Sequence, residues 1–303
     1  VFSDYVYESF WGNEGRYSGL FLITLYVVTL VLVGKLGRAK KWYLDLFMAS
    51  AVLVCLLGIT DYFRLDVLGW KTNVNSNQLD SFTSTLGNIN TYTAFVAMAM
   101  GVSCGLFLTE KNLFRCIWNY AVVIVVFFAI ITGQSDNAYL ALGALFAFAP
   151  FLAFRSRSGL GRYAVLAASF MTVMKIIDEI NKAKADKVIG LSGLFNFLVN
   201  YEHLEVIVIA LWMLVAVLYV WNWSASCRGK KEEIGKWLRI VWSCVLAAAA
   251  LVVLYVVYDA NFGNNPERYA SLSQYLIFND SWGTGRGYCW RIGWESYRKL
   301  PLL

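Results

Sequence analysis

Residues 203–222, which read HLEVIVIALWMLVAVLYVWN, decide the fold class of this chain. Glu205 is the last charged residue in the stretch, and almost every side chain after it is aliphatic or aromatic. A helix rises about 1.5 Å per residue and the hydrocarbon core of a bilayer is about 30 Å thick, so about 20 such residues span a membrane. Because hydrocarbon offers no water to an open backbone, we expect this stretch to be a transmembrane helix.

Comparable apolar segments recur along the chain. They occupy residues 17–34, 43–60, 91–108, 116–132, 138–154, 163–178 and 237–258. The composition agrees, because 59% of the residues are hydrophobic and only 15% are charged, whereas a soluble domain carries about 25% charged residues. The sequence therefore predicts an all-α fold: a polytopic transmembrane helical bundle with about eight spans, in which residues 1–303 form a single membrane domain.

Lys and Arg are concentrated in the short connections on one side of the predicted bundle. They are Lys35, Arg38, Lys40, Lys41, Lys111, Arg115, Arg155, Arg157, Arg162, Arg228, Lys230, Lys231, Lys236 and Arg239. Short loops with such a bias stay in the cytoplasm, so the other connections lie outside. These outer segments are 1–16, 61–90, 133–137, 179–202 and 259–303. If the chain holds a site, we expect it to face outward. The net charge of +6 reflects the basic loops, and we expect no nucleic acid as a partner.

The two ends of the sequence suggest a fragment. The chain begins at Val1 in a polar, aromatic stretch and stops at Leu303 within a predicted outer segment. Since the first residues are predicted to lie outside, we expect an odd number of helices upstream. We expect residues 259–303 to be the start of a large extracytoplasmic loop.

The metal-binding residue types are sparse. The six cysteines form no CxxC pair and most lie in or beside apolar segments, which is typical of small buried hydrophobic residues. His203 is the only histidine. The sequence therefore predicts no metal site and no cofactor.

Two polar stretches lead into predicted spans from the outer side. Arg16, within residues 11–20, belongs either to an interfacial turn or to an anion contact at the outer mouth. Residues 84–91, which read STLGNINT, include Asn88 and Asn90. Such side chains cap helix amides, but an outward helix N-terminus also favours an anionic group.

Three further polar features lie at the predicted outer ends. The tight turn at residues 132–137 contains Ser135 and Asp136, and Asp136 either caps the next helix or contacts a sugar hydroxyl. His203 is either an interfacial histidine held by a neighbouring carboxylate or a general base. Lys175 and Asp178, one helical turn apart, are interpreted as a local ion pair.

The last segment, residues 279–303, is the most specific. After a glycine-rich turn, Trp290, Trp294 and Tyr297 recur at helical spacing, which predicts an amphipathic helix on the outer membrane surface. Arg286 and Arg291 suit phosphate oxygens, because a guanidinium offers a planar fork of donors. A purely interfacial anchor is the alternative.

These residues, in this order, resemble the O-antigen ligase and Wzy-type polysaccharide polymerase family over most of the chain. The resemblance is carried by Gly87-Asn88-Ile89-Asn90, the Ser135 turn, Arg286-Gly287-Tyr288-Cys289-Trp290, Leu300-Pro301-Leu302-Leu303 and, more weakly, Glu14-Gly15-Arg16-Tyr17-Ser18-Gly19-Leu20. In the family an Arg-x-x-x-Trp pattern opens the large outer loop.

The resemblance implies a helical glycosyltransferase in the bacterial cytoplasmic membrane, without metal or nucleotide sugar. Such an enzyme moves a glycan from a polyprenyl-diphosphate carrier to an acceptor hydroxyl of a glycan or lipid on the outer side. Arg286 is then the expected catalytic residue, because a diphosphate leaving group needs cationic donors. Arg291, Arg16 and Arg64 are lesser candidates for binding the substrate. Asn88, Asn90 and Ser135 either bind sugar or cap helices.

The sequence departs from the family at two points. Many relatives carry a Ser-Arg pair in the short outer turn, where Asp136 and Asn137 follow Ser135 here. The family's proposed base is a His that would lie beyond Leu303, and His203 does not match its position. We therefore expect the fragment to be inactive alone.

Two other classes of function stay open at this point. A transporter or flippase for a lipid-linked or small anionic substrate would place charges near mid-membrane and break helices there. In this sequence almost all charges lie at the ends of the predicted spans, and only three prolines occur. A structural membrane subunit is the other possibility.

Overall fold

The structure is a computed structural model that describes residues 4–12, 18–38, 40–72, 74–75, 79–80, 83–229, 233–263, 268–269 and 273–299. Over these ranges the chain is helical, and it contains no strand. An isolated antiparallel bridge joins Ser156 and Glu233. The chain divides into two compact units, Val1–Leu53 and Val54–Leu303, and each is described by itself.

The first unit contains α1 (Val6–Trp11), α2 (Leu20–Leu36) and the first half of α3 (Lys41–Tyr62). Helix α1 folds back onto the start of α2. The rings of Phe10 and Trp11 lie 5.8 Å and 5.1 Å from the ring of Phe21, and the Gly19 amide donates to the Trp11 carbonyl at 3.2 Å. Contacts between large aromatic rings therefore fix the local turn between the two helices.

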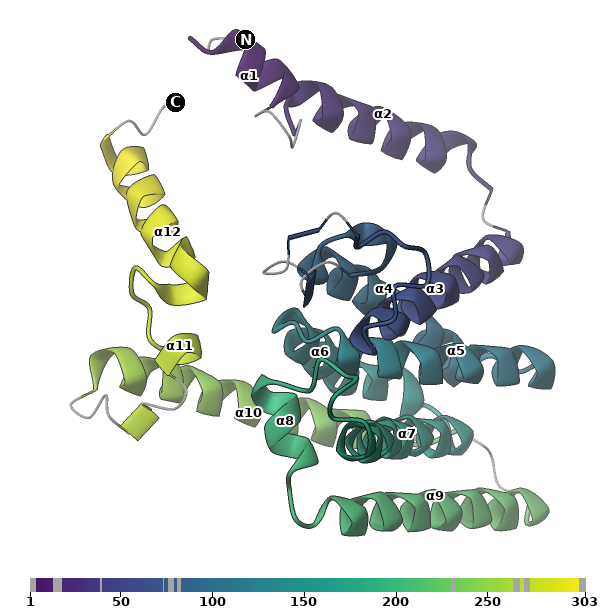
Figure 1. The fold of residues 1–303 in the computed structure, drawn as a ribbon. Coiled ribbons are helices and arrows are strands. Elements are labelled where there is room, and N and C mark those ends of the chain that lie inside the picture. Colours follow the sequence, from purple (N-terminus) through teal and green to yellow (C-terminus); the bar gives the residue numbers. More distant parts are fainter. Residues whose placement is uncertain are drawn as a thin grey trace. The chain divides into compact units, whose positions relative to one another are not determined.

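The second unit holds the remaining elements, which follow α3 in chain order. They are the 3₁₀ helix η2 (Ser84–Leu86), α4 (Ile89–Thr109), α5 (Leu113–Thr132), α6 (Asn137–Ala153), α7 (Arg157–Ala183), α8 (Gly193–Val199), α9 (Leu204–Cys227), α10 (Trp237–Phe262), α11 (Ser273–Leu276) and α12 (Trp282–Lys299). Figure 1 shows these helices along the chain.

Each apolar segment predicted from the sequence is a helix in the structure. Six of these helices, α3, α4, α5, α7, α9 and α10, are long and apolar enough to cross a membrane. Helices α2 and α6 are apolar but have only 17 residues each, which corresponds to about 26 Å. The chain is therefore a multi-pass helical membrane protein, and the number of eight spans stays a prediction.

The core of the second unit lies among α4, α5, α6 and α7, with α9 packed along α7 (Figure 1). Val96 and Met100 of α4, Phe127 and Ile130 of α5 and Met174 of α7 are all almost completely buried. These aliphatic and aromatic side chains stand where the helices meet. Within a bilayer the exclusion of water does not drive helices together. Their packing depends on contacts between side chains, and small residues allow the backbones to approach closely.

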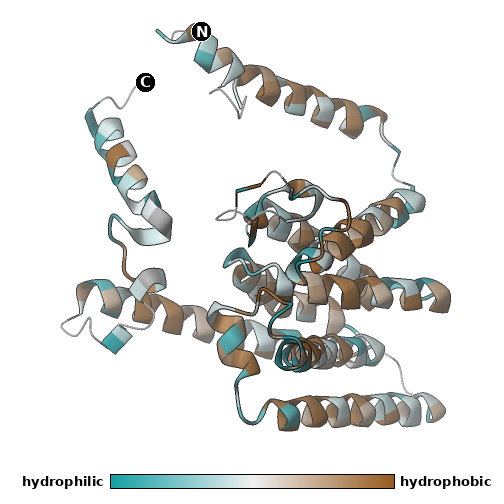
Figure 2. Ribbon diagram, viewed as in Figure 1, coloured by the Kyte–Doolittle hydropathy of each residue, from teal (hydrophilic) through white to brown (hydrophobic). Residues whose placement is uncertain are grey.

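Helices α9 and α10 present apolar side chains on almost every side. Figure 2 colours both helices as hydrophobic over much of their length. No residue in the most apolar window of α10 is buried, and Leu251, Val252, Val253 and Leu254 are between 59% and 66% exposed. A helix that is hydrophobic all round requires a hydrophobic surrounding, so this surface is compatible with contact to lipid.

One end of the second unit brings together residues of the connections 61–90, 133–137 and 179–202, which were predicted to be outer segments. The Ile189 amide donates to the Tyr62 carbonyl at 3.0 Å, and the Tyr62 hydroxyl donates to the Asn181 side chain at 2.6 Å. Ser135, in the turn between α5 and α6, donates to Asn90 at the start of α4. Helix ends that lie far apart in sequence are therefore joined by hydrogen bonds at one end.

The opposite end gathers basic connections. Arg162 donates to the carbonyls of Phe107 at 2.8 Å and Glu110 at 2.6 Å, which joins α7 to the end of α4. The Ile234 amide donates to the Arg155 carbonyl at 3.0 Å. The helices thus alternate in direction as the charge pattern requires.

Gly58 of α3 makes room for the buried Tyr92 of α4, because a Cβ there would overlap the ring and hydroxyl of Tyr92. We expect Gly58→Ala to lower the free energy of unfolding by about 1–3 kcal/mol, the usual cost of overpacking. Thermal unfolding of the purified protein in detergent measures the effect.

Gly101→Ala is the matched control, since it lies within α4 and a Cβ there meets no atom within 4 Å. Its stability should be unchanged or slightly higher, because Ala favours helix more than Gly does. Equal stability of the two variants would show that the packing of Tyr92 against α3 does not depend on Gly58.

Candidate functional site

The turn between α5 and α6 is held against the first turn of α4 by a buried hydroxyl. Ser135 is 5% exposed, and its Oγ donates to Oδ1 of Asn90 at 2.8 Å. Asn90 itself is exposed, and its side-chain nitrogen Nδ2 has no partner among the residues that the structure describes. Two of the predicted sugar-binding residues are therefore in contact, and Asn90 keeps free donors.

Asn88 has the capping role that the sequence left open. It precedes α4, and its Oδ1 accepts hydrogen bonds from the Asn90 amide at 2.9 Å and the Thr91 amide at 3.2 Å. These are two of the amides that have no partner within the helix. Gly87 has a φ of 69°, so the chain enters the cap through a left-handed residue. The side-chain oxygen of Asn88 is thus occupied.

A third connection, the segment before α8, contacts the α5–α6 turn through Gln134. Its side-chain amide donates to the Gly190 carbonyl, and its Oε1 accepts from the Ser192 hydroxyl at 2.9 Å. Gln134 has a φ of 47°, which is uncommon for a residue with a side chain. These contacts hold the α5–α6 turn against the segment before α8. We call Asn88, Asn90, Gln134, Ser135 and Ser192 the polar rim.

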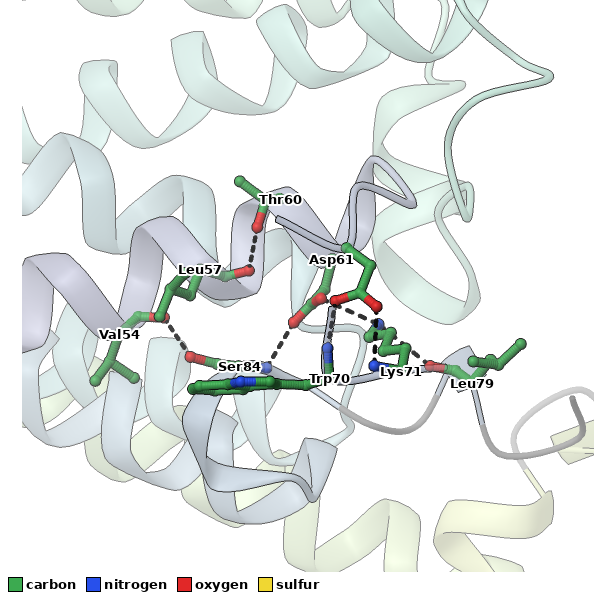
Figure 3. A network of polar contacts seen from close by, with 9 residues as sticks. Val54, Leu57, Thr60, Asp61, Trp70, Lys71, Leu79 and Ser84 are labelled. Carbon is green, nitrogen blue, oxygen red and sulfur yellow. Dashed lines mark hydrogen bonds and ion pairs between the residues drawn. The ribbon is translucent and has the colours of Figure 1, made fainter. Parts of the chain in front are cut away.

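A second polar network organises the connection between α3 and α4 (Figure 3). Asp61 at the end of α3 pairs with Lys71 at 3.1 Å and accepts from the Ser84 amide at 2.6 Å. The Ser84 hydroxyl donates to the Val54 carbonyl at 2.7 Å. Ser84 has a φ of 54°, so these two bonds hold a conformation that costs energy for a residue with a Cβ.

Sequence analysis did not select Asp61 or Lys71 as functional residues. The sequence feature that could have identified these two residues is a carboxylate at the end of a predicted span, followed by a lysine in the same connection. Which charge pairs with which depends on how the loop returns to α3. The hydrogen bonds of Ser84 set the path of this loop, and no periodic pattern in the sequence predicts them.

Arg64, a predicted substrate-binding residue, lies beside this network. It is exposed, and it lines a recess of about 400 Å³ together with Asp61, Asp66, Lys71 and Asp80. Three carboxylates outnumber two cations there. A diphosphate in this recess would meet net negative charge, so the surroundings of Arg64 do not favour that ligand.

Arg291 on α12 is paired with two carboxylates. Its Nε and Nη2 donate to the two oxygens of Asp280 at 2.9 Å and 2.8 Å, and its Nη1 lies 3.2 Å from Glu295. The hydrogen bonds from Arg291 lower the pKa of Asp280, so the pair is ionised at neutral pH. The charge of Arg291 is thus neutralised locally.

Arg286 contrasts with Arg291 on the same helix. It is exposed, and it makes no hydrogen bond or ion pair with any residue in the described ranges. Its side chain lies beside Gly283. A Cβ at the next residue, Gly287, would overlap the Asn279 carbonyl, so the start of α12 approaches this backbone only because residue 287 is a glycine.

The segment that leads into α12 is tied to the α5–α6 turn. The Tyr275 hydroxyl donates to Asp136 at 3.3 Å, and the Trp282 indole donates to the Tyr275 carbonyl at 3.1 Å. Asp136 stands at the N-cap position of α6, as the capping alternative expects, but its side chain makes no capping hydrogen bond. Its carboxylate instead accepts from Tyr275 of α11, which links the segment before α12 to the turn that contains Ser135.

The remaining sequence candidates divide into three cases. Arg16 lies outside the described residues. His203 is exposed and packs edge-on against Tyr201 at 5.7 Å, and the described part of the chain gives it no carboxylate partner. Lys175 lies 3.7 Å from Asp178 and also pairs with Glu179 and Glu205, which confirms a local ion pair.

No group of three or more His, Cys, Asp or Glu residues that could hold a metal ion occurs in the described ranges. Comparison with models of known protein families gives no match, and neither do comparisons with curated proteins and with solved structures.

Asp61→Ala tests whether the Asp61 network holds the α3–α4 connection. We expect the Ser84 amide to exchange its hydrogen about tenfold faster, because it loses a charged acceptor. Amide hydrogen exchange followed by mass spectrometry measures this.

Asp80→Ala is the control, since Asp80 lines the same recess but is exposed and makes no ion pair with the described residues. Its Ser84 exchange should match that of the unmodified protein. If Asp61→Ala exchanges no faster than this control, the network does not organise the loop.

Proposed function

We propose that this chain is the membrane part of a glycosyltransferase of the O-antigen ligase and Wzy-type polymerase kind. It transfers a glycan from a polyprenyl-diphosphate carrier to an acceptor hydroxyl of a glycan or lipid. The observation that carries the proposal is Arg286, an exposed guanidinium without a partner in the described ranges. It lies on α12, whose Trp282 donates to Tyr275 of α11, and Tyr275 in turn donates to Asp136, the residue after Ser135 of the polar rim.

The charge around each arginine supports Arg286 as the contact to diphosphate. Arg291 already donates to two carboxylates, and Arg64 stands among three. An unpaired guanidinium has all its donors available for phosphate oxygens, on which negative charge accumulates as the bond to the sugar breaks. Arg286 therefore has the catalytic role in this proposal, and Arg291 positions the helix.

The polar rim supplies groups suited to sugar hydroxyls. Asn90 is exposed and its side-chain nitrogen Nδ2 has donors to spare, while Ser135 fixes the orientation of the Asn90 side chain. Asn88 contributes indirectly, by capping α4 so that Asn90 begins the first turn at a defined position. In this proposal the uncharged donors of the polar rim bind the sugar and the cationic Arg286 binds the diphosphate. The two kinds of group thus match the two parts of a lipid-linked glycan.

The proposal includes a location and an orientation. We propose that the chain lies in a bacterial cytoplasmic membrane with about eight spans, α2 and α6 included, and with its basic connections inside. The polar rim then faces outward, and α12 lies on the outer membrane surface. Trp290, Trp294 and Tyr297 of α12 are all more than half exposed, as suits aromatic side chains at headgroup depth.

The arrangement of charges disfavours the transporter alternative. The central parts of the spanning helices, such as residues 163–174 of α7 and 240–258 of α10, contain no charged residue. Pro150 lies near the end of α6, and the six membrane-length helices are each continuous. Transporters usually place charged groups and broken helices near mid-membrane.

Two native cysteines test the orientation. Cys289 is exposed on α12, and Cys227 is exposed at the basic end of α9. We expect a membrane-impermeant maleimide to label Cys289 in intact cells and Cys227 only after permeabilisation. Cys289→Ser and Cys227→Ser assign the labelled sites by mass spectrometry. Labelling of Cys227 alone in intact cells would reverse the orientation.

Arg286→Ala tests the contact to diphosphate. A hydrogen bond to a charged group contributes about 1.5–3 kcal/mol, so we expect undecaprenyl diphosphate to bind this variant about 10- to 100-fold more weakly. Arg286→Lys should fall between, since it keeps the charge but loses the planar fork. Binding is measured with the protein in lipid nanodiscs.

Arg298→Ala is the control, because Arg298 is another exposed arginine of α12 and has no ion pair with the described residues. It should bind the lipid normally. In cells that produce the whole protein, Arg286→Ala should also reduce surface glycan. Unchanged glycan would favour a structural subunit, and ion flux through the protein in liposomes would favour a transporter.

A further inference from the structure

A recess at the base of α12 combines aromatic rings with polar groups. It has a volume of about 410 Å³ and is lined by Phe278, Trp282 and Trp290 together with Asn279, Asp280 and Arg291. Volumes of this size are typical of small-molecule sites, in which a largely apolar lining carries a few placed polar groups. Neither the predicted phosphate contact nor the polar rim accounts for these aromatic side chains.

The three rings form a connected group. The ring centres of Phe278 and Trp282 are 5.1 Å apart with planes at 67°, and those of Trp282 and Trp290 are 5.1 Å apart with planes at 50°. Trp282 is anchored through its indole to the Tyr275 carbonyl. Trp290 is 62% exposed, so its ring offers surface to a ligand.

The charges at the recess disfavour an anion. Arg291 is paired with Asp280 inside the recess and with Glu295 beside it, so these three side chains carry a net negative charge. Each carboxylate still has lone pairs that accept hydrogen bonds from hydroxyl groups. Asn279 accepts from the Ser281 amide and hydroxyl through Oδ1, and its side-chain nitrogen has no partner among the described residues.

The start of α12 lies close to the Asn279 backbone at the recess because residue 287 lacks a side chain. Gly287 lines it, and a Cβ there would overlap the Asn279 carbonyl. The Tyr288 amide donates to the Asp280 carbonyl at 3.0 Å, which fixes the start of α12 against this segment. Arg286 directly precedes Gly287, so the unpaired guanidinium and the recess belong to the same turn.

We propose that this recess binds a neutral sugar ring, namely the sugar that is linked to the diphosphate of the lipid carrier. The apolar face of the ring stacks on Trp290, its hydroxyl groups donate to Asp280, and the Asn279 amide donates to a ring hydroxyl. The assignment rests on the proposed function, since Arg286 supplies the adjoining contact to diphosphate. It adds a saccharide subsite that recognises the donor separately from its phosphates.

Saturation-transfer NMR tests the proposal with the methyl β-glycosides of glucose, galactose and N-acetylglucosamine. The protein is held in nanodiscs of zwitterionic phosphatidylcholine. We expect transfer to the ring protons of at least one glycoside, reduced about fivefold in Trp290→Ala because the stacking surface is lost. Trp290→Phe, which restores an aromatic face, should recover most of the signal.

Trp294→Ala is the matched control, since Trp294 lies one turn further along α12, is 61% exposed and stacks on Tyr297 rather than lining the recess. It should leave the transfer unchanged. Equal loss in Trp290→Ala and Trp294→Ala would overturn the assignment, as would the absence of transfer to all three glycosides. Binding of inorganic pyrophosphate that depends on Trp290 would make the recess an anion site instead.

The result is separable from the proposed function. Undecaprenyl diphosphate without a sugar should bind the Trp290→Ala and unmodified proteins equally, whereas the same lipid carrying N-acetylglucosamine should bind the variant more weakly. If binding of the bare lipid depends on Arg286 but no sugar binds, the saccharide subsite fails and the proposed function stands. If sugars bind but Arg286→Ala does not weaken diphosphate binding, the proposed function fails.

Discussion

The structure depends on one constraint, namely that a backbone crossing hydrocarbon must satisfy its own hydrogen bonds. Helices do so within each segment, and the connections carry the polar groups that remain. Chemistry is therefore confined to the two ends of the bundle. At the basic end, Arg162 uses its guanidinium to hold the carbonyls of Phe107 and Glu110. At the other end, side chains of several connections meet one another, and a site can form there.

Short polar contacts between connections give that end its order. Ser135 reaches Asn90, Gln134 reaches the segment before α8, and Asp61 holds Ser84 in a left-handed conformation. Each contact satisfies a group that would otherwise be buried without a partner or held under strain. The polar rim is thus a framework built largely from hydrogen bonds between uncharged groups. A ligand would meet its exposed groups, such as the side-chain nitrogen of Asn90.

Local charge balance distinguishes arginines that look equivalent in sequence. Arg286 and Arg291 lie five residues apart on one helix, yet carboxylates surround one and leave the other free. A paired guanidinium stabilises the start of α12, whereas an unpaired one keeps its donors for a ligand. The same reasoning assigns the aromatic recess beside Arg291 to a neutral ligand, so the proposed contacts to diphosphate and to sugar occupy adjoining positions on one turn.

The sequence by itself determined the helical class, the positions of the apolar helices and the gathering of basic residues at one end. Hydrophobic length and loop charge are local properties, so segments such as residues 203–222 report them directly. Asn88 as a cap was also within reach, because capping involves only neighbouring residues. Only the tertiary structure decided that Asp136 meets Tyr275, that Asp61 pairs with Lys71 and that Arg291 is neutralised while Arg286 is not. These contacts depend on how each loop folds back onto the helices. Contacts between side chains on different segments produce no periodic pattern in the sequence.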